Sequence, residues 1–199
     1  GMALSCACDI DYKRLEEFLT AAGLPSGAGY TCHKKMFSEH TFDMVTIATW
    51  TESHCSIAID AVKNGARVIV LEKPLGYSLK SARSLLEAAE KKGCIIIINH
   101  ERRYDHRYRK VREIIESGQI GRVKTVNARI LTGPFRGESK KELGGGPLLH
   151  DGTHLVDIIR FYFGDALSVK GEFHRDSRKS GFEDSAMAWI KTSSGVDIF

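Results

Sequence analysis

Short apolar segments alternate with amphipathic segments through roughly the first half of the chain. The apolar segments have the length of β-strands and are found at residues 2–8, around Tyr30, and at 44–48, 68–71 and 94–98. The segments between them carry apolar residues at helical spacing, as in 12–22, 53–64 and 79–92. Strands that alternate with helices in this way form a parallel sheet with right-handed βαβ connections. The sequence therefore predicts an α/β fold with a Rossmann-like parallel sheet.

Local signals place the ends of these helices. Asp11 is a plausible N-cap for the first helix, and Gly23, Gly65 and Gly93 each follow the last periodic residue of a helix. The segment 94–98 is almost purely aliphatic, which predicts a strand that is covered on both faces.

The pattern changes after a further helix that ends near Gly118. Residues 123–131 are rich in β-formers, a glycine run at 144–146 precedes a long helix that reaches Phe163, and two more strands are expected at 169–173 and 186–192. We therefore expect a Rossmann-like domain at 1–119 and part of an α+β domain with an open sheet at 120–199.

Composition narrows the class of protein. The chain is 42% hydrophobic and 27% charged with a net charge of +4, which is ordinary for a globular domain and too mild to indicate nucleic-acid or membrane binding. The longest apolar run, Cys94–Ile98, is far shorter than a membrane span. Five cysteines without a C-x-x-C pair predict reduced core thiols and a cytoplasmic protein.

Asp9 is the first candidate for chemistry because it follows the first predicted strand. A carboxylate at that place can accept hydrogen bonds from the two ribose hydroxyls of NAD and repel the 2′-phosphate of NADP. Asp11 competes for this role, and either aspartate can instead cap the following helix.

The tripeptide Glu72-Lys73-Pro74 directly follows the strand 68–71. The carboxyl ends of parallel strands line the ligand crevice of an open α/β sheet, so Lys73 is placed to reach a substrate. The alternative is a surface lysine paired with Glu72.

The helix after the glycine run carries two histidines. At about 100° per residue His150, His154 and Asp157 share one face, while apolar residues occupy the other. An imidazole of ordinary pKa can take a proton from a hydroxyl, which indicates a catalytic face. Two alternatives remain: the histidines are hydrogen-bonded within a domain interface, or His150 and His154 ligate a metal, although no glutamate or cysteine cluster supports a metal site.

The basic run at 101–110 looks like a nucleic-acid patch at first sight. Its aromatic residues fall at helical spacing, however, which favours core-facing rings and a solvated charged face. Arg103 is the exception, because it lies just past a strand end where a substrate can be met.

Taken in order, these motifs resemble the Gfo/Idh/MocA oxidoreductases, a family of NAD(P)-dependent enzymes that act on sugars, polyols such as inositol, and related compounds. The resemblance covers nearly the whole chain. The motifs that carry it are Asp9, the segment 48–54, Glu72-Lys73-Pro74, the segment 99–104 and the GGG…H helix at 144–154.

The resemblance implies a role for each motif. Asp9 would hold the adenosine ribose, and the turn formed by Thr49, Trp50, Thr51 and His54 would contact the cofactor. Glu72 and Lys73 would lie beside the nicotinamide ribose and the substrate. Arg103, His150 and His154 would bind substrate, with proton transfer carried by Lys73, His154 or His150. The implied cofactor is NAD rather than NADP.

Three departures from the family pattern stand out. Trp50 and Thr51 replace the usual proline and asparagine, and His150 stands where many members carry an aspartate. The expected first strand with its G-x-G-x-x-G loop is also missing, and Gly23–Gly29 is no substitute because it follows a helix and precedes a strand. We therefore expect an incomplete copy of a longer two-domain enzyme, with its sheet cut short at Phe199.

The sequence thus predicts hydride transfer between a nicotinamide cofactor and a sugar, polyol or related hydroxy compound. One alternative is a cofactor-free binding or scaffold protein with the same fold, and the other is a metal-dependent enzyme that uses His150 and His154. We expect a small-molecule substrate, no nucleic-acid or membrane partner, and a homo-oligomer that associates through the sheet of the second domain.

Overall fold

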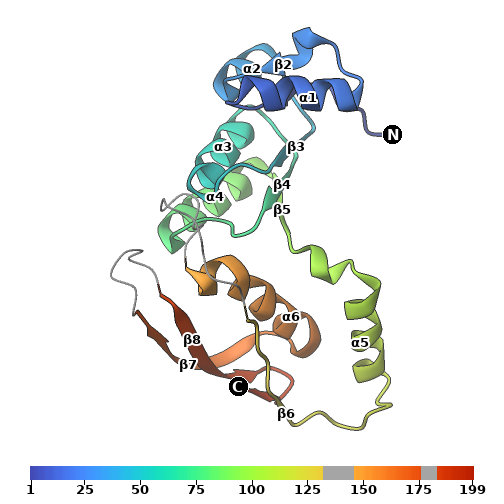
Figure 1. Ribbon diagram of the computed structural model, residues 1–199, viewed down its shortest axis with the longest axis vertical. Coiled ribbons are helices and arrows are strands. Elements are labelled where there is room, and N and C mark those ends of the chain that lie inside the picture. The colour runs from blue at the N-terminus through green and yellow to red at the C-terminus, as the bar shows by residue number, and fades with distance from the viewer. Residues whose placement is uncertain (132–145, 176–182) are drawn as a thin grey trace. The chain divides into compact units, whose positions relative to one another are not determined.

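The computed structural model describes residues 1–131, 146–175 and 183–199. The chain divides into two compact units, which Figure 1 shows in colours that follow the sequence. The first unit contains Gly1–Thr49, Ser53–Leu71 and Ser78–Ile97. The second contains Trp50–Glu52, Glu72–Tyr77 and Ile98–Phe199.

The first unit begins with a small parallel pair of strands. Its elements are β1 (Ala7–Cys8), α1 (Tyr12–Ala22), the 3-10 helix η1 (Ser26–Ala28), β2 (Gly29–Tyr30) and α2 (His33–Glu39). Asp11 caps α1 as expected, since its side chain accepts from the backbone N–H groups of Lys13 and Arg14, and Gly23 ends the helix at φ 66°. Buried Leu15 and Leu19 attach α1 to this pair.

The remaining strands of the first unit form a second sheet. Its elements are β3 (Met44–Ile47), α3 (Thr51–Lys63), β4 (Val68–Glu72), α4 (Leu79–Lys92) and β5 (Ile95–Asn99), with strand order β3-β4-β5. Both helices lie on the same side of the sheet in Figure 1. Ile69 and Leu71 of β4 are fully buried, as are Ala58 of α3 and Leu85 of α4, so the core lies between this sheet and its helices.

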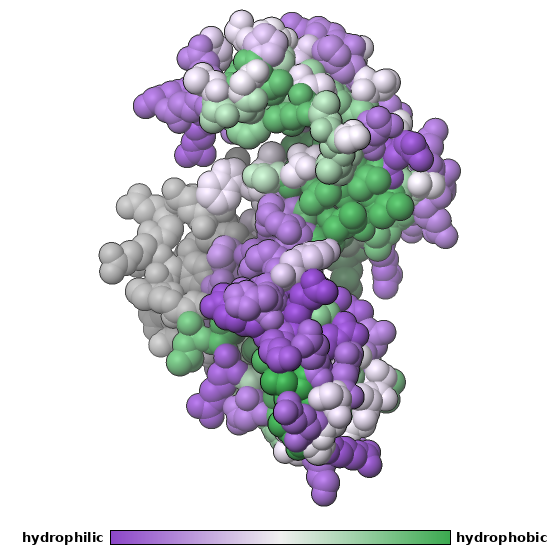
Figure 2. All heavy atoms as spheres, turned by 90° about the vertical axis from the view of Figure 1, so that its right-hand side faces the viewer, coloured by the Kyte–Doolittle hydropathy of each residue, from purple (hydrophilic) through white to green (hydrophobic). Residues whose placement is uncertain are grey.

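The other face of this sheet is open within the first unit. Ile95 is 60% exposed and Ile97 39% exposed, and Met44 is exposed on β3. Figure 2 views the molecule from the right-hand side of Figure 1 and shows an area of hydrophobic surface in green on that side. The expectation that residues 94–98 form a strand covered on both faces is therefore wrong, because α3 and α4 both lie on one side of the sheet and no helix of this unit covers the other side.

The second unit combines helices with a mixed sheet. Its helical elements are η2 (Glu101–Arg103), α5 (His106–Glu116), the π-helical turn η3 (Leu148–Gly152) and α6 (Thr153–Phe163). Its strands are β6 (Thr125–Val126), β7 (Ala166–His174), β8 (Ser185–Thr192) and β9 (Asp197–Ile198), in the order β6-β9-β8-β7. Strand β6 runs parallel to β9, whereas the other pairs are antiparallel. Ile159 and Phe163 of α6 pack with Ile190 and Ile198 in the core.

These elements confirm an α/β fold with Rossmann-like parallel strands followed by a second domain with an open sheet. The parallel strands are divided between two separate sheets, β1-β2 and β3-β4-β5. Two local expectations are wrong, since the stretch 123–131 contains only a two-residue strand and Tyr104, expected to face the core, is 71% exposed. Strand β9 follows the turn at Ser194-Gly195 and pairs with β8. Gly144 and Gly145 of the glycine run lie outside the described residues.

All five cysteines are free thiols, but only Cys55 and Cys94 are buried. Cys32 is exposed, so the prediction of core thiols fails there. In the described ranges, no helix combines the length and apolar character that a membrane span requires.

Opposite faces of the β3-β4-β5 sheet give a first prediction. Ile69→Ala leaves a cavity against α3 and α4 and is expected to lower the free energy of unfolding by about 2–5 kcal/mol. Ile95→Ala, the same change at an exposed position, is expected to cost at most about 1 kcal/mol. Urea unfolding followed by circular dichroism measures both values. Equal losses would contradict the assignment of the buried face.

Candidate active site

The carboxyl ends of β4 and β5 bring two polar side chains together. Glu72 ends β4 and Asn99 ends β5, and the Asn99 side-chain amide donates to Glu72 Oε1 at 2.5 Å. The backbone N–H of Lys73 donates to the other oxygen, Glu72 Oε2, at 3.3 Å. The Glu72 carboxylate is thus held by its neighbours at the strand ends, where ligands of parallel sheets bind.

Lys73 connects these strand ends to a distant part of the chain. Its Nζ donates to the backbone carbonyl of His150 at 3.0 Å, across 77 positions of sequence. The ammonium group therefore bonds to the η3 turn, and the described residues show no ion pair between it and Glu72. The alternative of a surface lysine paired with Glu72 does not describe this side chain.

The two histidines of the η3–α6 segment lie in different surroundings. The π-helical turn breaks the regular spacing that placed His150 and His154 on one helical face. The side chain of His150 is 41% exposed, with Nδ1 3.1 Å from Asp151 Oδ1. His154 is buried, at 7% exposure, as is Asp157 one turn further along α6.

A bidentate ion pair joins η2 to α6. Arg103 Nε donates to Asp157 Oδ2 at 2.8 Å, and Nη2 donates to Oδ1 at 2.7 Å. The hydrogen bond to Asp157 raises the pKa of the guanidinium. His100 Nδ1 lies 4.0 Å from the same carboxylate. Arg103 thus forms a structural pair here, and its expected contact with substrate stays a prediction.

His154 has the environment of a neutral base. Its ring lies edge-on to His100 with centroids 6.3 Å apart, and its Nδ1 lies 3.6 Å from Glu101 Oε1. Burial lowers the pKa of His154, and the positive charges of Lys73, Arg102 and His100 act in the same direction, while Glu101 opposes them. The imidazole is therefore neutral near pH 7 and can accept a proton.

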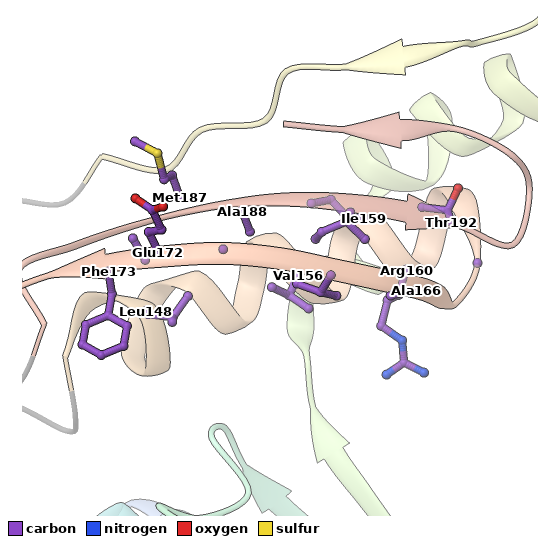
Figure 3. A pocket seen from close by; sticks show the side chains of 15 residues that line it. Leu148, Val156, Ile159, Arg160, Ala166, Glu172, Phe173, Met187, Ala188 and Thr192 are labelled. Atoms are coloured by element: carbon purple, nitrogen blue, oxygen red, sulfur yellow. The ribbon is translucent and has the colours of Figure 1, made fainter.

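Two cavities border α6 in the second unit. One has a volume of about 400 Å³ and includes His100, Asp157 and Thr153 in its lining, so it adjoins the polar cluster around His154. The other, of about 320 Å³, lies between α6 and the β7–β8 hairpin and is lined mainly by apolar side chains such as Val156 and Ile159 (Figure 3). The first cavity brings together His100, Thr153 and Asp157, which are polar groups suited to a hydroxylated substrate.

The residues expected to bind the cofactor are divided between the two units. Asp9, Thr49 and His54 belong to the first, and Trp50, Thr51, Glu72 and Lys73 belong to the second. Asp9 Oδ1 accepts the backbone N–H of Asp11, and in the described part of the chain its Oδ2 makes no hydrogen bond. His54, 1% exposed, donates from Nε2 to the Thr49 carbonyl at 2.8 Å and so fixes the turn before α3. Trp50 is 54% exposed and Thr51 is buried.

Four polar residues around His154 had no individual role predicted from the sequence, namely Asn99, His100, Glu101 and Asp157. The first three directly follow the strand 94–98, and the strand-end rule that selected Lys73 applies equally to them. Asp157 was placed on the face of His154 but was given no partner. Among the described residues, no group of three or more His, Cys, Asp or Glu is arranged to hold a metal ion.

Comparison with known proteins relates both parts of the chain to one family. Residues 1–100 match the profile of an oxidoreductase family with an NAD-binding Rossmann fold, GFO_IDH_MocA, and residues 108–198 match the Gfo/Idh/MocA C-terminal domain. The chain belongs to the Gfo/Idh/MocA oxidoreductase family. The resemblance inferred from the motifs is therefore confirmed.

Curated relatives and solved structures agree with this membership. The chain is 30% identical to 1,5-anhydro-D-fructose reductase of Ensifer adhaerens over 177 residues, which cover 85% of this chain and 53% of the relative. It is 26% identical to inositol 2-dehydrogenase of Salmonella typhimurium over 201 residues, covering 100% of this chain and 58% of the relative. The chain thus spans just over half the length of these relatives.

Two solved structures share the fold. The myo-inositol 2-dehydrogenase of Lactobacillus plantarum superposes with a TM-score of 0.81 at 24% identity, covering 100% of this chain and 61% of that one. The WlbA dehydrogenase of Chromobacterium violaceum superposes with a TM-score of 0.83 at 21% identity, covering 96% and 56%.

The Arg103–Asp157 pair gives a second prediction. Asp157→Asn removes the charge of a buried partner and is expected to lower the free energy of unfolding by about 1–3 kcal/mol. The matched change Asp165→Asn, in the exposed pair with Arg160, is expected to cost at most about 1 kcal/mol. Denaturant unfolding of both variants provides the comparison. A loss at Asp165 as large as that at Asp157 would show that the buried pair does not join η2 to α6.

Proposed function

We propose that the protein is an oxidoreductase that transfers a hydride between NAD and a sugar, polyol or related hydroxy compound. The observation that carries this proposal is the Lys73–His150 hydrogen bond, which joins a strand-end lysine to the segment bearing His154. Family membership and the names of the relatives, a reductase of a sugar derivative and an inositol dehydrogenase, support the same reaction class.

The described residues include groups suited to bind part of the cofactor, namely a ribose hydroxyl. Asp9 at the end of β1 has a carboxylate oxygen without a hydrogen bond, which suits a ribose hydroxyl, and its charge disfavours the 2′-phosphate of NADP. The turn from Thr49 to Thr51, held by His54, would contact the cofactor, as would Glu72. Gly23–Gly29 connects α1 to β2 and is not a phosphate-binding turn. When bound, the nicotinamide supplies the hydride acceptor or donor.

The chain's own residues would handle the substrate hydroxyl and its proton. The Lys73 ammonium, held at the His150 carbonyl, would orient the reacting oxygen. His154, kept neutral by burial, would accept the proton as the alcohol is oxidised and return it in the reverse direction. Arg103 and His150 would border the substrate. In this proposal His154 rather than Lys73 takes the proton.

We further propose a separate function for each of the two parts of the chain. Residues 1–119 would carry nucleotide binding, and residues 120–199 substrate contact and self-association. The sheet of the second unit exposes Met187, Trp189 and Phe199, which supports a homo-oligomer formed through that sheet. Five free thiols support a cytoplasmic location.

Steady-state turnover tests the proposed function. The protein is assayed with NAD⁺ and NADP⁺ against a panel of polyols and sugars, with NADH formation followed by absorbance. We expect NAD-dependent oxidation of at least one compound, and a fall in kcat of at least about 100-fold in Lys73→Met and in His154→Asn. No turnover together with no NADH binding would favour the cofactor-free binding protein. Wild-type rates in both variants would refute the assigned roles.

Asp9 and Asp11 give a matched pair for cofactor binding. Asp9→Asn removes the charged acceptor and is expected to weaken NADH binding by about tenfold or more. Asp11→Asn preserves a good N-cap and is expected to leave both stability and NADH affinity nearly unchanged. Calorimetric titration with NADH measures the affinities. A stronger effect at Asp11 would transfer the ribose contact to that residue.

The lowered pKa of His154 predicts the pH dependence of oxidation. The reaction needs a neutral imidazole, and His154 stays neutral until the pH falls below its lowered pKa. The acid limb of kcat/KM should therefore lie below about pH 6.5, the ordinary histidine value. An acid limb above that value would mean that another group controls the proton transfer.

A further inference from the structure

One ring nitrogen of His154, Nδ1, lies close to a carboxylate oxygen of Glu101. This nitrogen is buried and makes no hydrogen bond within the described residues, and it lies 3.6 Å from Glu101 Oε1. That distance is slightly too long for a hydrogen bond. Catalytic hydrogen bonds are often long before substrate binds and shorten in the complex. The Glu101 side chain is 56% exposed and has room to make this small movement.

The other groups that act on His154 cannot replace Glu101. The Lys73 ammonium and the Arg102 guanidinium are donors without an acceptor atom. The ring of His100 meets His154 edge-on, and its Nδ1 lies toward Asp157, which already accepts from Arg103. Of the described groups around His154, Glu101 is the one suited to accept a proton bond from Nδ1.

We propose that Glu101 is a positioning residue for His154. Its carboxylate holds the imidazole in the tautomer with hydrogen on Nδ1, so that the Nε2 lone pair faces the substrate hydroxyl. This inference rests on the proposed function for its catalytic part. In the oxidation direction the proton of the substrate hydroxyl passes to Nε2 of His154. The carbon that bears this hydroxyl gives up a hydride to NAD⁺. The alcohol thereby loses two electrons and becomes a carbonyl compound, and His154 becomes an imidazolium whose charge Glu101 balances.

The electrostatics of the cluster give Glu101 a second effect. Burial, Lys73, Arg102 and His100 all disfavour the imidazolium form of His154, and Glu101 alone favours it. Within the described residues, Asp157 on the same helix is engaged by Arg103. Loss of the Glu101 charge should therefore lower the pKa of His154 further and weaken it as a base.

Nuclear magnetic resonance of histidine-labelled protein tests this without cofactor or substrate. The His154 signal is assigned by its loss in His154→Asn, and its nitrogen shifts report the tautomer. In the wild type we expect hydrogen on Nδ1. Glu101→Ala removes the acceptor and should produce a mixture of tautomers, and Glu101→Gln removes the charge and should lower the measured pKa of His154. The control Glu113→Gln, on exposed α5, should change neither.

Kinetics provide the second readout. Glu101→Gln is expected to lower kcat by about tenfold with little change in KM, and to move the acid limb of kcat/KM to lower pH. Hydrogen on Nε2 in the wild type, or an unchanged tautomer in Glu101→Ala and an unchanged pKa in Glu101→Gln, would overturn the proposal. If the resonance results hold but no panel compound is oxidised, the proposed function fails while the positioning of His154 by Glu101 stands.

Discussion

One hydrogen bond, from Lys73 Nζ to the carbonyl of His150, connects the carboxyl end of β4 to the η3–α6 segment that bears His154. The local sequence around Lys73 does not predict that its side chain contacts a helical segment almost eighty residues later in the chain. The contact forms because β4 ends at the edge where ligands of parallel sheets bind and because η3 presents the His150 carbonyl, which also accepts from the Thr153 hydroxyl at 3.3 Å. The assignment of Lys73 and His154 to one site depends on it.

The second long-range contact in this region, between Arg103 and Asp157, is an ion pair rather than a hydrogen bond to a backbone carbonyl. A buried aspartate is costly unless it is paired, and the two-pronged guanidinium satisfies both of its oxygens. The same pair fixes η2 against α6, and η2 carries Glu101 to the side of His154. A structural ion pair therefore helps to place the Glu101 carboxylate beside the His154 imidazole.

The strand and helix pattern and the strand-end motifs could be read from the sequence because they depend on local rules. Asp11 and Gly23 cap α1 where capping chemistry predicts. The exposure of Ile95 could not be read, because an aliphatic strand looks the same whether one face or two are covered. The π-helical turn at His150 was also hidden, since regular helical spacing gives no sign of an extra residue. The ion pair between Arg103 and Asp157 could not be predicted either, because the two residues are distant in sequence.

The central claim is that the ammonium of Lys73 and the imidazole of His154 share one site. The most direct measurement is the pKa of His154, by magnetic resonance titration, in the wild type and in Lys73→Met. Because the lysine charge lowers this pKa, its removal should raise the measured value, while Lys170→Met on the exposed strand β7 should leave it unchanged. An identical His154 pKa in the wild type and in Lys73→Met would contradict the shared site.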